Sequence, residues 1–117
     1  MAALTKVTPA LAGTATTPAA ASAGGDSVAN PRGNTILRVV NGGGSSINVT
    51  LAAQVTTRAA DGTFPAMTLS NQVVAVANGA TRLIGPIPPA FNDGNGNVQI
   101  TYSAVTSVTI EAIDPGL

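Results

Sequence analysis

A two-residue alternation of apolar and polar side chains constrains the fold of this chain more than any other feature. In residues 46–55, 97–104 and 108–112, every second side chain is apolar. Successive side chains of a β-strand point to opposite faces of a sheet. The alternation therefore predicts strands with one face in a core and the other face outward.

Further strands are predicted at residues 35–40, 66–70, 72–77 and 81–84, and no segment has helical periodicity. Val, Ile and Thr together supply 34 of the 117 residues, and these side chains favour strands. Turn dipeptides separate the strands: Asn41-Gly42, Asp61-Gly62, Asn78-Gly79, Asp93-Gly94 and Asn95-Gly96. The predicted fold is all-β, either an antiparallel β-sandwich or a jelly-roll-like barrel.

The first 31 residues differ in composition from the rest of the chain. They are rich in Ala, Thr, Ser, Pro and Gly, and Pro9, Pro18 and Pro31 prevent a continuous helix. We expect residues 1–31 to form an extended N-terminal arm and residues 32–117 to form a β-sandwich domain. An extended arm of this kind can pair with the edge of a neighbouring sheet.

Few side chains in this sequence can perform chemistry. It has no His, no Cys, five basic and five acidic residues, so the net charge is zero. Imidazole is the usual proton shuttle near neutral pH and thiolate is the strongest common nucleophile. Nucleic-acid binders need a concentrated basic surface. No apolar run approaches the roughly 18 residues that cross a bilayer. We expect no enzymatic activity, no cofactor, no metal, and no nucleic-acid, membrane or small-molecule partner.

Three segments superficially resemble ligand sites, and each has a simpler structural interpretation. Residues 92–97 carry oxygen ligands at alternate positions, but Asp93 is the only carboxylate, so a hairpin turn is favoured over a Ca²⁺ loop. Residues 42–44 are three glycines after a strand, but a strand follows them where a phosphate loop needs a helix. The scattered acidic residues favour solvation and turn roles over hydrolysis.

Eight residues are candidates for contact with other subunits: Leu4, Val7, Leu11, Arg38, Arg82, Pro86, Pro88 and Pro89. The first three are apolar side chains of the arm. The two arginines interrupt apolar strands, either on a solvated face or in ion pairs with a neighbouring subunit's carboxylates. The prolines belong to the stiff segment 85–89, which either crosses between sheets or docks on a partner.

Three stretches resemble a known group of proteins: GNTILRVVNG at 33–42, NGATRLIGPIP at 78–88 and VQITYS at 98–103. They are similar to the Gly/Ala/Thr/Val-rich head decoration or minor capsid proteins of tailed bacteriophages, of the actinobacteriophage type. The resemblance spans about residues 10–113 and provides no catalytic residues to transfer.

The resemblance implies a capsid decoration, or cementing, protein that binds the outer surface of a phage head. Such a protein stabilises contacts between capsomers of the major capsid protein, commonly as a homotrimer. Its expected location is the outer capsid surface of the virion, after synthesis in the host cytoplasm. Two alternatives remain: a tail-tube, head-completion or fibre subunit, and a carbohydrate- or cell-surface-binding β-sandwich module.

Overall fold

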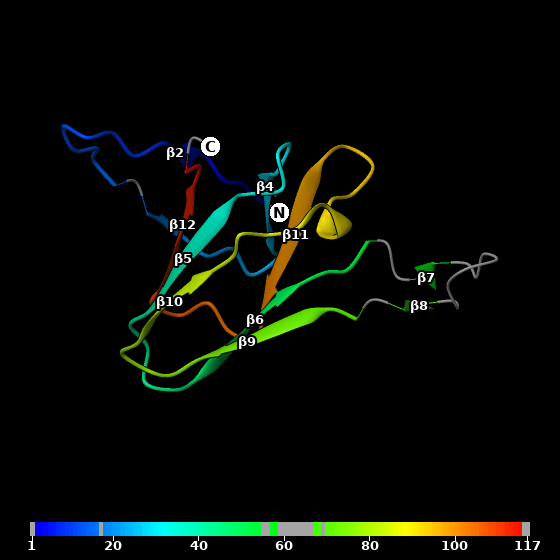
Figure 1. Cartoon of the computed structure of the whole chain (residues 1–117). Helices are drawn as coiled ribbons and strands as arrows, with labels where there is room; N and C mark the ends of the chain where they lie inside the picture. The colour runs from blue at the N-terminus through cyan, green and yellow to red at the C-terminus, as the bar shows by residue number, and fades with distance from the viewer. Residues whose placement is uncertain (1, 17, 55–56, 59–66, 69, 116–117) are drawn as a thin grey trace.

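The computed structural model is nearly all-β, with two main sheets that face each other (Figure 1). It describes residues 2–16, 18–54, 57–58, 67–68 and 70–115. Sheet A has the strand order β1 (Ala2–Ala3), β4 (Asp26–Ala29), β11 (Asn97–Tyr102), β6 (Ile47–Leu51) and β9 (Gln72–Val76). Sheet B has the order β10 (Thr81–Ile84), β5 (Ile36–Asn41), β12 (Val108–Ile113) and β2 (Lys6–Val7), and β3 (Ala19–Ala20) also pairs with β12. The remaining elements are the paired strands β7 (Thr57–Arg58) and β8 (Met67–Thr68), and the 3₁₀ turn η1 (Pro89–Phe91).

Apolar side chains from the two sheets form a single core between them. Leu37 and Val39 of β5 and Val98 and Ile100 of β11 are fully buried. The residues between Leu37 and Val39, and between Val98 and Ile100, are partly exposed, as the alternation predicts. Full burial of each large apolar side chain stabilises the fold by about 1.5–3 kcal/mol.

The prediction of an all-β chain with two packed sheets is confirmed. Both sheets stay open at their edges in the described ranges, so they form no closed barrel there. The jelly-roll alternative stays a prediction. The Asp61-Gly62 turn lies outside the described residues, and of the strand predicted at 66–70 only residues 67–68 form a described strand.

The connection between β9 and β10 takes the chain from sheet A to sheet B through a tight turn. The Ala80 amide donates to the Ala77 carbonyl at 3.0 Å. Gly79 has a φ of +75°, a conformation that glycine adopts readily. The turn therefore forms at the predicted Asn78-Gly79 dipeptide and places β9 and β10 at the same end of the sandwich.

Residues 2–29, which the sequence assigns to an extended arm, contribute strands to both sheets. β1 pairs in parallel with β4, and β2 pairs in parallel with β12. β4 also pairs with β11, and its Val28 lies in the core. The domain boundary at residue 31 stays a prediction from the sequence. β4, which precedes that boundary in the chain, lies between β1 and β11 in sheet A.

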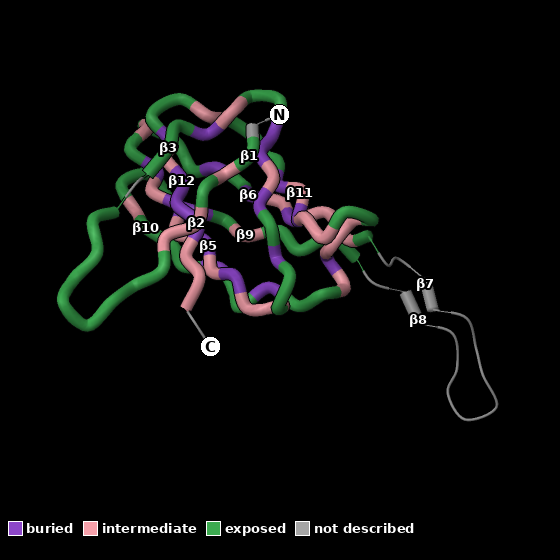
Figure 2. Tube along the Cα trace, turned by 90° about the horizontal axis from the view of Figure 1, so that it is seen from above, coloured by how far each residue is buried: buried purple, intermediate pink, exposed green. Residues whose placement is uncertain are grey.

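Between β2 and β3 the chain leaves the sandwich as a projecting loop (Figure 2). Residues 8–16 of this loop are all exposed. We refer to residues 8–16 as the arm loop. The strands on either side of the loop, β2 and β3, both pair with β12 and so anchor its two ends.

Candidate functional site

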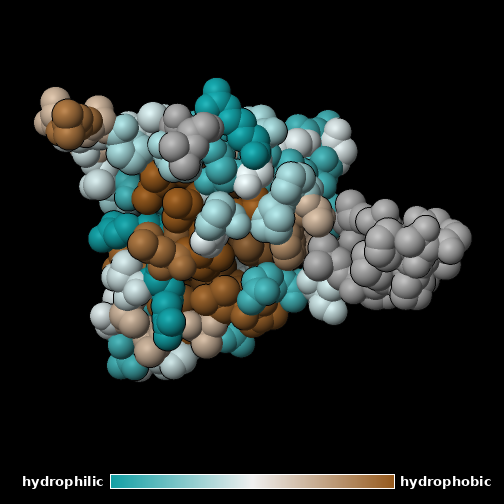
Figure 3. Space-filling view, viewed as in Figure 1, coloured by the Kyte–Doolittle hydropathy of each residue, from teal (hydrophilic) through white to brown (hydrophobic). Residues whose placement is uncertain are grey.

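A groove lined mainly by apolar residues opens between β9 and β10, the outermost strands of sheets A and B. Its volume is about 380 Å³, and we refer to it as the β9–β10 groove. Leu51 and Val74 line it from sheet A, and Ile84 and Ile87 line it from β10 and the segment that follows. Apolar side chains gather on the face of the molecule shown in Figure 3. The groove thus reaches the core residues Leu51, Ile84 and Ile87, which stay buried beneath it.

Leu83 marks the rim of the groove and was not among the residues singled out from the sequence. It is 67% exposed, whereas the adjacent Ile84 is buried. Two consecutive apolar residues in one strand must point to opposite faces, so one of them had to leave the core. That adjacency is the signal that could have identified Leu83. Val73 on β9 is also exposed, at 51%.

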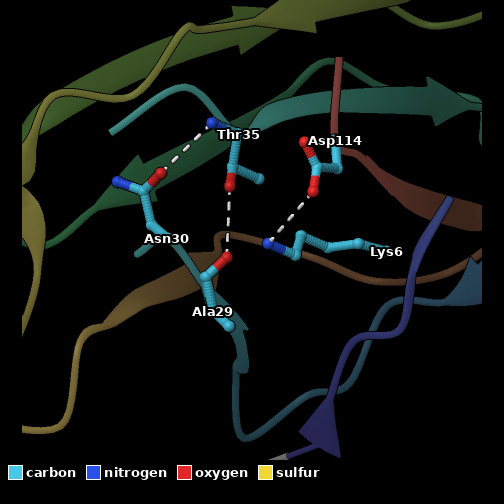
Figure 4. Close-up of polar contacts among 5 residues, drawn as sticks. All are labelled: Lys6, Ala29, Asn30, Thr35 and Asp114. Atoms are coloured by element: carbon cyan, nitrogen blue, oxygen red, sulfur yellow. Dashed lines mark hydrogen bonds and ion pairs between the residues drawn. The ribbon is translucent and has the colours of Figure 1, made fainter. Parts of the chain in front are cut away.

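Asn30 fixes the wall of the groove from inside the protein. Its side-chain amide donates to the Ile87 carbonyl at 2.9 Å and to the Asn92 side-chain oxygen at 2.8 Å. Its side-chain oxygen accepts from the Thr35 amide at 3.1 Å (Figure 4). The Ile87 amide in turn donates to the Thr35 carbonyl at 3.0 Å. These bonds satisfy buried polar groups and tie the backbone of Ile87, which lines the groove, to Asn30 and Thr35.

The three candidate prolines lie in the segment between β10 and β11. Pro86 and Pro88 line the groove, and both are exposed. Pro89 begins η1 and contacts Gly33 so closely that a β-carbon there would come within 2.8 Å of its ring. The segment crosses from sheet B to sheet A, which is one of its two predicted roles. Its role in docking stays a prediction.

The two candidate arginines have different surroundings. Arg38 on β5 pairs with Glu111 on the adjacent β12, with 3.8 Å between Nη1 and Oε1. Its carboxylate partner thus comes from the same chain. Arg82 on β10 is exposed and forms no ion pair with any described acidic side chain. Of the two arginines, Arg82 is the one that lies next to a residue of the groove, Leu83.

The three candidate arm residues are not brought together. Leu4 is partly buried against the core cluster. Val7 is partly buried and lines a cavity of about 190 Å³ together with Glu111. Leu11 is fully exposed, at 109%, in the arm loop. Of the three, only Leu11 is fully exposed.

The segment 92–97 is a hairpin connection whose carboxylate is used within the chain. Asp93 Oδ1 accepts from the amides of Asn95 and Asn97 at 2.8 and 3.1 Å, and Oδ2 accepts from Gln99 Nε2 at 2.7 Å. These hydrogen bonds, the one from Asn97 first, hold the pKa of Asp93 below its usual value. No group of three metal-ligating side chains occurs within the part of the chain that the structure describes.

A buried carboxyl group links the end of the arm to β11. Asp26 is inaccessible to solvent, and its Oδ2 accepts from the Tyr102 hydroxyl at 2.6 Å and from the Ser22 amide at 3.3 Å. Burial, together with the bond to Asp26, raises the pKa of Tyr102 above its ordinary value. The two residues are 76 positions apart, so no local sequence pattern could have indicated this pair.

Neither described aromatic ring is a fully exposed platform for a sugar. Phe91 is buried at the base of the groove, and Tyr102 is partly buried with its hydroxyl bonded to Asp26. Over the described ranges, no helix is long and apolar enough to cross a bilayer.

Comparisons with known proteins give this chain no relative. No family model matches it, and neither the curated proteins nor the solved structures include a significant match.

Proposed function

We propose that this chain is a virion structural protein that decorates the outer surface of a phage head. There it stabilises contacts between capsomers of the major capsid protein. The observation that carries the proposal is the uncovered apolar edge of the sandwich, where the β9–β10 groove and Leu83 face solvent. An exposed leucine beside a groove lined mainly by apolar residues is a candidate site of protein contact.

The backbone at this edge supports the same proposal. The Asn41 amide donates to the Ala80 carbonyl at 3.0 Å, which sets the phase of the β5–β10 ladder. In an antiparallel pair the hydrogen-bonded positions alternate, so Thr81 and Leu83 direct their backbone groups away from β5. No described strand pairs with that side of β10. A free edge next to an apolar groove invites a neighbouring polypeptide.

The charge content fits a protein that is covered by other subunits. Only 9% of the residues are charged, whereas a soluble domain has about 25%. Charge normally keeps free monomers apart, and a subunit fixed on a shell does not need it. The apolar edge and the low charge both point to a protein that works in an assembly. The resemblance to head decoration proteins is the reason we propose a phage head as that assembly.

Cryo-electron microscopy of virions from the phage that encodes the chain tests this function directly. We expect copies at regular positions over the whole head, touching two or more capsomers with about 1,000 Å² or more buried per copy. Heads that lack the chain should release their DNA at a lower temperature than complete heads. Rings along the tail or density at a single vertex would show instead that the chain is a tail or head-completion subunit.

A glycan array tests the carbohydrate alternative. We expect no glycan to bind the chain above background. Binding that is lost in a Tyr102→Ala variant that still folds would favour a sugar-binding module over head decoration.

A further inference from the structure

The arm loop exposes the side chain of Leu11, and the loop is closed by hydrogen bonds and contains no charged residue. Two backbone amides close the loop: Ala10 donates to Thr14 Oγ1 at 3.0 Å, and Gly13 donates to the Ala10 carbonyl at 2.9 Å. Thr14 Oγ1 also donates to the Thr8 carbonyl at 3.3 Å. Leu11 lies between these bonded residues and is fully exposed. Local hydrogen bonds thus hold it in place before any contact forms, which lowers the entropy lost on docking.

The arm loop and the β9–β10 groove lie at opposite edges of sheet B. The loop joins β2 to β3, both of which pair with β12, whereas β10 forms the other edge. β5 and β12 stand between them. A chain therefore presents its loop on one side and its groove on the other, and its own loop does not cover its own groove.

The loop and the groove match in charge. None of the residues that line the groove is ionisable, and residues 8–20 also contain no ionisable side chain. Buried charges that lose water without gaining a partner oppose association. A contact limited to these residues would bury no charged side chain of the loop or of the groove lining. The groove volume of about 380 Å³ also lies in the range of pockets that hold a small ligand, so it can accept a leucine side chain and its neighbours.

We propose that the arm loop of one copy docks in the β9–β10 groove of a second copy, with Leu11 inserted between the two sheets. This inference rests on the proposed function, and it names the subunit that covers the apolar edge. The contact joins two different surfaces, so it is head-to-tail and closes into a ring when the rotation between copies allows. One loop in one groove is a small interface compared with the roughly 1,200–2,000 Å² of stable complexes. Association of free copies is therefore weak, and it strengthens where a shell gathers them.

Cysteine cross-linking tests the contact, because the natural chain contains no cysteine. Leu11→Cys and Leu83→Cys place single thiols on the loop and on the groove rim, both at exposed positions. A short bis-maleimide is added to each variant alone and to an equal mixture. We expect a dimer from the mixture at a yield at least fivefold above that of either variant alone. Ser46→Cys, also exposed, replaces Leu83→Cys in the control mixture and should give only background.

Sedimentation velocity provides a second measurement without a cross-linker. We expect the apparent mass of the unmodified chain to rise with concentration. Leu11→Asp and Leu83→Asp should each weaken this association at least tenfold, because each places a charge in an apolar contact. Ser46→Asp should leave it unchanged. Thermal unfolding of all variants checks that they remain folded.

Several results would overturn the proposal. A monomer at every concentration, or equal yields from the test and control mixtures, would remove the loop-to-groove contact. Strong cross-linking of Leu83→Cys alone would show a two-fold contact between β10 edges instead.

The test is independent of the proposed function. Cross-linking in solution by a chain that is absent from phage heads would support the contact and reject head decoration. If the Leu11→Cys and Leu83→Cys variants decorate heads regularly but never cross-link, even on the head, head decoration is supported and the loop-to-groove contact is rejected.

Discussion

The two edges of sheet B differ in what covers them. At the β12 edge, β2 and β3 pair with the strand, and Glu111 is only 3% exposed. At the β10 edge, no described strand pairs, and Leu83 is 67% exposed. The N-terminal residues thus close one edge of the sandwich and leave the other open. β12 is the longer and more buried of the two strands, and β10 has four residues of which only Ile84 is buried.

Paired leucine substitutions give the largest expected contrast between core and open edge. Leu37→Ala removes a fully buried side chain next to Ile84 and Ala112 in the sheet register, and should lower the free energy of unfolding by about 2–5 kcal/mol. Leu83→Ala should change it by less than about 0.5 kcal/mol, because most of that side chain is already in water. Urea unfolding followed by circular dichroism measures both. Equal losses would mean that the open edge is part of the core of the isolated chain.

Asn30→Ala tests whether the groove is preformed. The substitution leaves the Ile87 carbonyl, the Thr35 amide and the Asn92 side-chain oxygen without this partner. We expect a loss of about 2–4 kcal/mol in the free energy of unfolding. The exposed Asn48 serves as the matched control, and Asn48→Ala should cost less than about 0.5 kcal/mol. If the two variants unfold alike, the Asn30 bonds do not hold the wall.

Removal of one arginine at a time compares the covered and the open side directly. Arg38→Met takes away the ion-pair partner of the buried Glu111, which should cost about 1–2 kcal/mol because Arg38 itself is partly exposed. Arg82→Met should be near neutral in the isolated chain. Chemical unfolding of both variants at one salt concentration provides the comparison. A larger loss for Arg82→Met would contradict the assignment of the open edge to a partner.

Alkaline unfolding probes the contact between Asp26 of β4 and Tyr102 of β11, which are adjacent strands of sheet A. The pKa of Tyr102 is raised in the folded state, so its contribution to stability is complete below the unfolded value of about 10 and is lost as pH rises above it. Above pH 10, the free energy of unfolding should fall by up to about 1.4 kcal/mol per pH unit from this group.

Tyr102→Phe supplies the control for that experiment. The variant should be about 1 kcal/mol less stable at neutral pH and should lose this part of the alkaline slope. Tyr102 is the single tyrosine of the chain, so its ionisation can be followed by absorbance. A parallel slope in the variant would assign the alkaline effect to other groups.

Local sequence patterns predicted most of the sandwich and little of the candidate site. The alternation at 97–104 corresponds to β11, and Asn78-Gly79 forms the turn between β9 and β10. Pro86 and Pro88 were identified from the stiffness of their segment, and they line the groove. The bonds from Asn30 to Ile87 and Asn92 and from Tyr102 to Asp26 were not predicted, because they join positions more than 50 residues apart.

The sequence alone determined that the chain is β-rich, which side chains alternate toward a core, and that little charge covers its exterior. These properties depend on neighbours along the chain, so a local pattern contains them. Only the tertiary structure decided that β2 and β3 cover β12, that β10 stays open and that Leu83 and Leu11 face solvent. Those outcomes depend on which distant segments meet, and pairing between sheet edges is set by the packing of the whole sandwich.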